Sequence, residues 1–347
     1  LLVRSDASRP VTVAGLLRWL LKYMVLAWFV VLLAILVAGL FKRNVVEEAE
    51  PLLGSLVLER LEQNDHCNAI LAISPDLQGQ LDTIGLMPER GSLHGVPVLV
   101  KDNIDVKGMP TTAGSRALLN NHAGKDSPVV ANLRRAGALI AGKANLSEWA
   151  NFRSTASTSG WSSVGGLTTN PFDASCSACG SSSGSGAAVG SGLVDIAIGT
   201  ETDGSITCPA AMCGVVGLKP TVGLLSCDGI VPISESQDTP GPMTRTVRLA
   251  AVALSAMAGE GSTHYEDSLD LGALEGLRLG VLTPLCGMYD DSVSAAFAAA
   301  RRTLEQAGAV LVEIDELPDL RRISQLEWEI LLREFKRDLN VYLSGRP

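Results

Sequence analysis

Apolar positions are distributed unevenly along this chain of 347 residues. Near the N-terminus, Tyr23–Phe41 is a run of 19 residues without a charge, and Lys22 and Lys42 flank it. About 20 apolar residues suffice to cross the hydrocarbon core of a bilayer, so the run predicts one N-terminal transmembrane helix. A secretory signal peptide and a buried helix are the alternatives, although the run is apolar on every face.

The charges around this run predict its orientation. The basic residues before it outnumber those that follow it directly, and they are Arg4, Arg9, Arg18 and Lys22. By the positive-inside tendency, this excess favours a single-pass membrane protein whose remainder faces away from the cytosol. A secreted protein is the alternative.

Beyond this run, the apolar positions follow the periodicities of helices and strands. Helical spacing predicts helices at residues 47–73, 129–136, 247–257, 292–307 and 323–343. Short apolar runs predict strands at residues 96–100, 138–140, 213–218, 277–282 and 309–314. Strands that alternate with helices from about residue 95 indicate an α/β layer protein.

The two ends of the chain suggest how it is divided. It begins at Leu1 rather than at a methionine, and little follows the last predicted helix. We therefore expect a fragment, with residues 1–45 as a tail and membrane segment. Residues 46–347 are expected to form one domain that lacks its C-terminal part.

Composition argues against several classes of protein. The formal net charge is −9 and no run of Lys or Arg is longer than two, so we expect no nucleic-acid partner. Seven cysteines spread over the chain imply no disulfide framework. Cys176 and Cys179 have the spacing of a zinc-binding pair, but serine–glycine clusters rather than a short knuckle separate them from Cys208 and Cys213. We expect no metal, and whether Cys176 pairs with Cys179 stays open.

Candidate chemistry is concentrated in two serine–glycine clusters, Gly180–Gly186 and Asp203–Ser205, with an apolar run at residues 187–198 between them. Dense glycines allow tight turns and let backbone amides approach a ligand, and serines among them are candidate nucleophiles. A flexible linker is the alternative, but a linker rarely encloses a hydrophobic segment.

A serine nucleophile needs a base that removes its proton. Gly180–Gly184 matches the nucleophile elbow of the α/β-hydrolases, with Ser182 at its centre. That motif needs a preceding strand, and Asp173–Cys179 does not read as one. The one histidine downstream is His264. A buried lysine is another kind of base, because desolvation lowers its pKa. Lys101 ends the apolar run 96–100, where a strand would deliver its amine to the edge of the sheet. The alternative is a lysine that merely marks the end of a strand.

Several ordered blocks of residues resemble the amidase signature family over about residues 50–347. The blocks are His94–Asn103, Gly142–Glu148, Gly180–Gly184, Gly199–Ile206, Gly214–Thr221, Gln237–Pro242 and Glu334–Asn340. The resemblance implies the amidase signature fold, a mixed twisted central sheet covered by helices on both faces. The predicted fold class is therefore α/β of this type, preceded by one N-terminal transmembrane helix.

The resemblance also implies a Ser-cisSer-Lys triad that hydrolyses linear carboxamide bonds through an acyl-enzyme, without a cofactor. Ser205 matches the nucleophile and Lys101 the general base. Ser181 matches the bridging serine, whose peptide bond with Gly180 is cis in the family. The implied oxyanion hole consists of the backbone amides of Thr202, Asp203, Gly204 and Ser205.

Two departures from the common family pattern bear on the substrate. Asp203 stands where many members have a glycine, and Thr207 stands where they have an arginine. This variant, like the Glu334–Asn340 block, is similar to the peptide amidase branch, which implies a peptide or small-molecule amide as substrate and release of ammonia or an amine. The alternatives are one chain of a glutamine-dependent amidotransferase, a fatty-acid-amide-type hydrolase and a catalytically inactive membrane-bound fragment.

Overall fold

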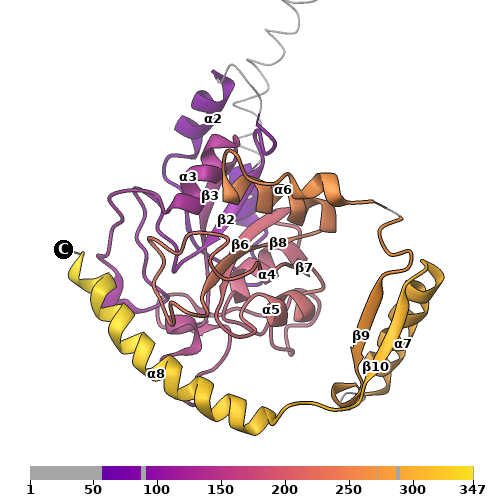
Figure 1. Cartoon of the computed structure of the whole chain (residues 1–347). Coiled ribbons are helices and arrows are strands. Elements are labelled where there is room, and N and C mark those ends of the chain that lie inside the picture. The colour runs from indigo at the N-terminus through magenta and orange to yellow at the C-terminus, as the bar shows by residue number, and fades with distance from the viewer. Residues whose placement is uncertain (1–56, 87–90, 271, 287–289, 347) are drawn as a thin grey trace, which may run out of the picture. The chain divides into compact units, whose positions relative to one another are not determined.

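The described part of the chain is built around a six-stranded mixed β-sheet (Figure 1). The computed structural model describes residues 57–86, 91–270, 272–286 and 290–346. In the strand order β1-β3-β2-β6-β8-β7, the strands are β1 (Ile70–Ile73), β3 (Leu139–Ala144), β2 (Pro97–Lys101), β6 (Ile196–Glu201), β8 (Thr239–Thr244) and β7 (Val216–Gly217). β2 is parallel to β3 and β6, and the other pairs are antiparallel. Parallel strands end at the same edge of a sheet, so Lys101 and Glu201 lie at one edge.

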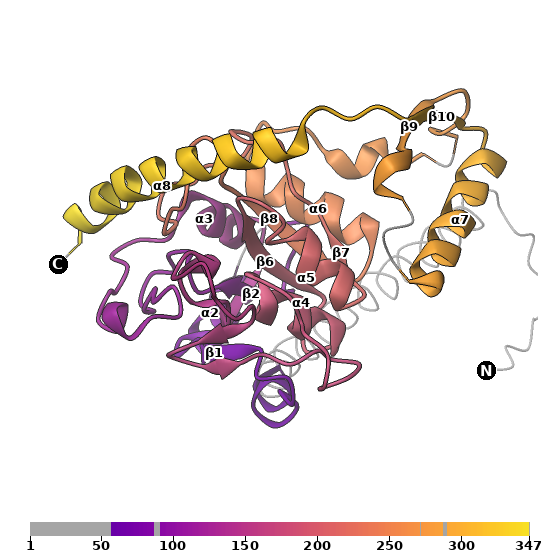
Figure 2. The ribbon, with the colours of Figure 1, turned by 90° about the horizontal axis from the view of Figure 1, so that it is seen from below.

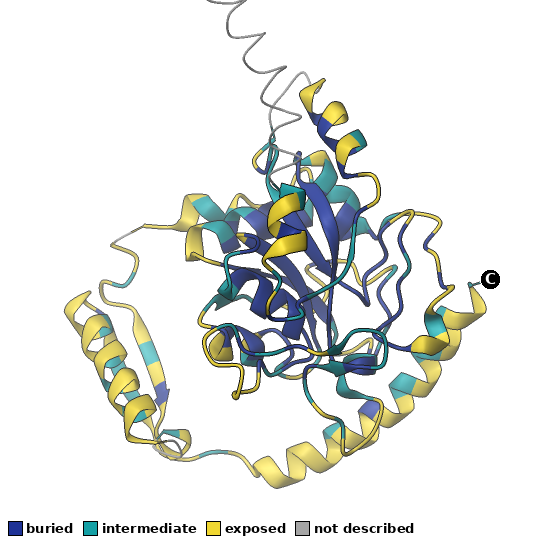
Figure 3. Ribbon diagram, turned by 180° about the vertical axis from the view of Figure 1, so that it is seen from behind, coloured by how far each residue is buried: buried dark blue, intermediate teal, exposed yellow. Residues whose placement is uncertain are grey.

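Helices cover both faces of this sheet (Figure 2). Successive side chains of a strand point to opposite faces. Val98 and Val100 pack with α3 and α6, whereas Leu99 packs with α4. The three helices are α3 (Pro128–Arg135), α6 (Val247–Ala258) and α4 (Ser183–Gly190). The central strands are therefore buried on both sides (Figure 3), and the predicted mixed sheet with helices on both faces fits the structure.

Further elements complete the described chain. They include α2 (Leu77–Gly85), α5 (Thr207–Met212), β4 (Trp161–Ser162), β5 (Gly166–Leu167) and the 3-10 turns η1 (Arg116–Leu118), η2 (Glu148–Asn151), η3 (Tyr265–Ser268) and η4 (Thr283–Leu285). A separate two-stranded parallel sheet pairs β9 (Arg278–Leu282) with β10 (Val310–Ile314), which α7 (Asp291–Gln306) connects. The long helix α8 (Leu320–Ser344) follows, and most of its residues are exposed (Figure 3).

The predicted helix at residues 47–73 is wrong in its last part. Residues 57–63 are helical, but Ile70–Ile73 form β1, which pairs antiparallel with β3. The Asp65 carboxylate accepts hydrogen bonds from the backbone N–H groups of Ala69 and Ile70, at 2.8 and 2.9 Å. These donors are then not available to a continuing helix, so strand pairing decides the conformation of the segment.

The strand β8 is not predicted by the sequence pattern. Its Pro240 and Pro242 lack backbone donors, and prolines argue against a strand inside a sheet. The carbonyls and the remaining N–H groups nevertheless pair with β6 over Thr239–Thr244. This pairing places the residue that precedes Thr239 next to the end of β6.

The predicted N-terminal transmembrane helix is corrected. Across residues 57–346, as far as the structure describes them, no helix is both long and apolar enough to cross a membrane. The predicted span Tyr23–Phe41 lies outside the described residues. The prediction of a single-pass membrane protein, and of attachment to a membrane through that helix, is withdrawn on this finding.

Candidate active site

Lys101 lies at the carboxyl end of β2 and is fully buried. Its Nζ donates hydrogen bonds to Ser181 Oγ at 2.7 Å, to Thr200 Oγ1 at 2.8 Å and to the Thr200 carbonyl at 3.2 Å. Burial lowers the pKa of Lys101 to about 7, although the carboxylates of Asp238 and Glu201 oppose this change. Near neutral pH, much of this amine is therefore unprotonated and able to accept a proton.

Ser181 precedes α4 in the chain by two residues and is also fully buried. Its peptide bond with Gly180 is cis, as the resemblance implies. The Ser181 carbonyl accepts a hydrogen bond from the Ser147 N–H at 3.0 Å. A Cβ at Gly180 would collide with the Ser147 hydroxyl unless that side chain moved, so the close approach of these two segments favours glycine there.

Ser205 lies between β6 and α5, and 8% of its surface is exposed. It lines a cavity of about 710 Å³ together with Gly180, Thr202, Asp203 and Trp328 of α8. Among the described residues, the Ser205 hydroxyl makes no hydrogen bond to Ser181 or Lys101. The structure thus brings Lys101 and Ser181 into direct contact and places Ser205 on the same cavity as Gly180.

The turn of four residues from Thr202 to Ser205 follows β6, and three of them, Thr202, Asp203 and Ser205, line this cavity. Within the described chain, the N–H groups of these four residues have no hydrogen-bond acceptor. The next two N–H groups, of Ile206 and Thr207, donate to the Glu201 carboxylate at 2.7 and 2.9 Å. Glu201 thereby holds the start of α5, while the predicted oxyanion donors are left without a protein partner.

The other serine and histidine candidates have different surroundings. Ser182 Oγ donates to the Thr200 carbonyl at 3.1 Å and accepts from the Thr200 N–H at 3.2 Å, so it joins α4 to β6. His264 is largely exposed and lies 3.5 Å from Glu266. Neither residue belongs to the Lys101–Ser181 pair, and the nucleophile elbow has no support.

Sequence reasoning missed a disulfide beside the site. Cys179 is bonded to Cys208, whereas Cys176 is exposed and has no disulfide. Cys179 directly precedes Gly180, and Cys208 lies in α5 shortly after Ser205. The bond therefore links the two serine–glycine clusters, and it leaves no thiolate on Cys179 for a zinc site. Two cysteines 29 residues apart gave no spacing signal for this pairing.

Several polar residues around the site also escaped the sequence reasoning. Thr200 contacts the Lys101 amine, and the Asp238 carboxylate accepts a hydrogen bond from the Thr202 hydroxyl. Both residues lie inside blocks that carry the family resemblance. Membership in these blocks singles out Thr200 and Asp238 as family residues, but only their contacts show which groups they bind.

Together, the mixed sheet and the buried lysine–serine pair define the class, an α/β protein with a serine–lysine site. The family model named Amidase matches residues 55–345, nearly all of the described chain. The chain belongs to the amidase family, which confirms the resemblance found in the sequence.

Individual relatives agree with this placement. A probable amidase of Arabidopsis thaliana is 42% identical over 272 residues, which cover 72% of this chain and 51% of the relative. A glutamyl-tRNA(Gln) amidotransferase chain of Natronomonas pharaonis is 41% identical over 72% of this chain and 60% of its own length. The solved structure of the peptide amidase from Stenotrophomonas maltophilia superposes with a TM-score of 0.80 at 43% identity, covering 85% of this chain and 64% of that one. The chain spans about half the length of the first of these curated relatives.

Proposed function

We propose that the protein hydrolyses linear carboxamide C–N bonds, with Ser205 as nucleophile, Ser181 as proton relay and Lys101 as general base. The observation that carries the proposal is the 2.7 Å contact between the buried Lys101 Nζ and Ser181 Oγ, beside the cavity that Ser205 lines. A lysine with a pKa of about 7 is a base matched to neutral pH.

In the first half of the reaction, Ser205 Oγ attacks the amide carbonyl and gives its proton to Ser181. Ser181 passes its own proton to the neutral Lys101 amine, which becomes an ammonium. When the tetrahedral intermediate collapses, the C–N bond breaks and the leaving nitrogen receives a proton back through Ser181. Ammonia or an amine departs, and an ester of Ser205 remains.

In the second half, water attacks the ester carbonyl, and its proton follows the same path. Lys101 accepts the proton of the water through Ser181 and returns it to Ser205 as the ester bond breaks. The products are a carboxylic acid and free Ser205. The unpartnered N–H groups of residues 202–205 would hold the negative oxygen in both halves, and one such donor is typically worth about 3 kcal/mol.

The proposed substrate is a peptide C-terminal amide or a small carboxamide. The likeness to the peptide amidase structure supports this class, as does Asp203 in place of the glycine of many family members. The similarity to the amidotransferase chain favours a second candidate, transfer of ammonia from glutamine within a larger assembly. The fatty-acid-amide alternative rested on the membrane helix, so it is not proposed here.

A fluorophosphonate probe tests the nucleophile directly. The parent protein should be labelled, and the Ser205→Ala and Lys101→Ala variants should not be. Ser175→Ala, which changes an exposed serine outside the site, is the control and should label like the parent. Labelling that persists in Ser205→Ala would sink the assignment of the nucleophile, and an unlabelled parent would favour an inactive protein.

Substrate comparison then separates the two candidate reactions. A dipeptide amide should be converted to the free acid by the isolated chain, with one ammonia released for each acid formed. Release of ammonia from glutamine alone, with no turnover of the peptide amide, would instead favour the amidotransferase role.

A further inference from the structure

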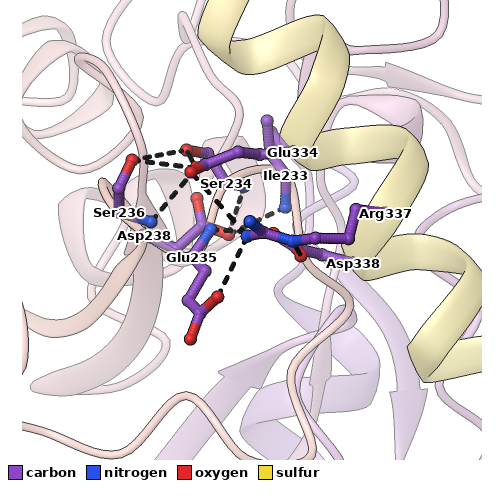
Figure 4. A network of polar contacts seen from close by, with 8 residues as sticks. All are labelled: Ile233, Ser234, Glu235, Ser236, Asp238, Glu334, Arg337 and Asp338. Atoms are coloured by element: carbon purple, nitrogen blue, oxygen red, sulfur yellow. Dashed lines mark hydrogen bonds and ion pairs between the residues drawn. The ribbon is translucent and has the colours of Figure 1, made fainter.

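The loop that precedes β8 is held on its outer side by α8 (Figure 4). Ser236 donates to Glu334 through its hydroxyl at 2.8 Å and through its N–H at 3.2 Å, and the Ser234 hydroxyl contacts the same carboxylate. The Glu235 N–H donates to Asp338 at 3.0 Å, and the Glu235 carboxylate pairs with Arg337 at 2.9 Å. One turn and a half of α8 thus contacts three consecutive loop residues.

The Asp238 carboxylate holds the same loop through a second set of hydrogen bonds, and Figure 4 shows those within the loop. One oxygen of this carboxylate accepts from the N–H groups of Ile233 and Ser234, at 2.8 and 2.9 Å, and the other accepts from the Thr202 hydroxyl. All three partners are donors, which suits the ionised carboxylate, since it can only accept. Burial raises the pKa of Asp238, and these hydrogen bonds oppose the rise.

The register of the sheet explains why Asp238 reaches Thr202. Glu201 is opposite Thr239 in the antiparallel pairing of β6 with β8. Thr202 and Asp238 are the next residues outward on the two strands, so their side chains meet at the edge where Lys101 ends β2. The contact therefore lies between the loop held by α8 and the turn that carries Ser205.

We propose that Asp238 is a positioning residue for the hydrolysis, one that orients the Thr202–Ser205 turn and sets the charge around Lys101 while α8 holds its loop in place. The inference rests on the proposed function. Asp238 would act through Thr202 and Lys101 and not on the substrate itself.

The electrostatic part follows from the charges that face Lys101. Asp238 and Glu201 are the carboxylates that raise the pKa of Lys101 against its burial. The nearby Asp102 is paired with Lys143 at 2.9 Å. Asp238 therefore helps Lys101 to hold the proton that it takes up when Ser205 attacks.

The first test is the pH dependence of kcat/KM for a dipeptide amide in Asp238→Asn. Lys101 must be unprotonated to act as base, so activity rises as the pH passes through its pKa. Loss of the Asp238 charge lowers that pKa, and the acidic limb of the profile should move to lower pH. Asp228→Asn is the matched control, because Asp228 is an exposed carboxylate of the preceding loop with no hydrogen bond or ion pair from its side chain to a described residue. Its profile should coincide with that of the parent.

The second test keeps the charge and removes the contact. Thr202→Val deletes the hydroxyl that donates to Asp238, and we expect kcat to fall about tenfold with the acidic limb unmoved, the size of effect expected for one hydrogen bond to a charged group. Glu334→Gln weakens the hold of α8 and should lower kcat less, again without a shift of the limb.

These outcomes separate the inference from the proposed function. If the parent is labelled and active but the limb of Asp238→Asn stays in place, the electrostatic role is wrong. An unchanged kcat in Thr202→Val would overturn the positioning role, and that variant also decides the matter if Asp238→Asn does not fold. A parent that neither labels nor turns over an amide would contradict the proposed function instead.

Discussion

The ends of two neighbouring strands, β2 and β3, carry two fully buried lysines with different partners. Lys143 on β3 pairs with the Asp102 carboxylate at 2.9 Å and donates to the Ile104 and Pro110 carbonyls at 2.8 and 3.0 Å. Lys101 on β2 has only hydroxyl and carbonyl partners within hydrogen-bond distance in the described chain. Val100, the residue before Lys101, is in register with Lys143, so both side chains come from the same edge of one sheet.

The difference between the two lysines is therefore one of counter-charge rather than burial. A buried ammonium is costly unless a carboxylate compensates it, and the Asp102–Lys143 pair meets that condition. Lys101 lacks such a partner, so burial lowers its pKa to about 7. We infer that Lys143 supports the structure, and we propose that Lys101 supplies the chemistry.

The largest expected effect comes from Lys101→Met. This substitution removes the proposed base and places an unbranched apolar side chain of similar length at the same buried position. We expect kcat/KM for a peptide amide to fall by about 10⁴-fold or more, the loss typical of a missing member of a catalytic triad. The free energy of unfolding, measured in urea, should change by less than about 1.5 kcal/mol. A variant that unfolds without losing activity per folded molecule would reverse the roles of the two lysines.

The matching change at the other lysine, Lys143→Met, should act mainly on stability. It leaves Asp102 buried without its partner, and breaking such a pair typically costs about 3–5 kcal/mol. Urea unfolding should show this loss, and the double variant Lys143→Met with Asp102→Leu should recover part of it. A single variant as stable as the parent would show that the ion pair does not hold this edge of the sheet.

The smallest effect expected is the pH dependence of the unmodified protein. Below the pKa of about 7, Lys101 becomes protonated and can no longer accept a proton. The value of kcat/KM should therefore fall about tenfold for each unit of pH below that point, as for any single essential base. Measurements between pH 5 and pH 9 with a neutral amide substrate check this. A flat profile across that range would mean that Lys101 is not the base.

Much of the fold could be predicted from local pattern. The helices α3, α6 and α7 and the strands β2, β3, β9 and β10 lie within a few residues of their predicted ranges, because each has a periodicity that its own residues reveal. β8 could not be predicted, since its prolines contradict a strand and only the pairing with β6 overrides them. The end of the helix predicted at residues 47–73 failed for a similar reason, because β3 supplies a strand partner from far along the chain.

The candidate site, like the fold, could be predicted from the sequence only in part. By itself, the sequence determined which residue types are present in which order, and through its motifs it singled out Lys101, Ser181 and Ser205 as candidates. Only the tertiary structure decided that Lys101 touches Ser181 with no carboxylate among its hydrogen-bond partners in the described chain, that Cys179 bonds to Cys208, and that Asp238 joins Thr202 to the loop held by α8. Burial, counter-charge and contact depend on segments distant in the chain, and these set the pKa of a lysine and the partners of a carboxylate.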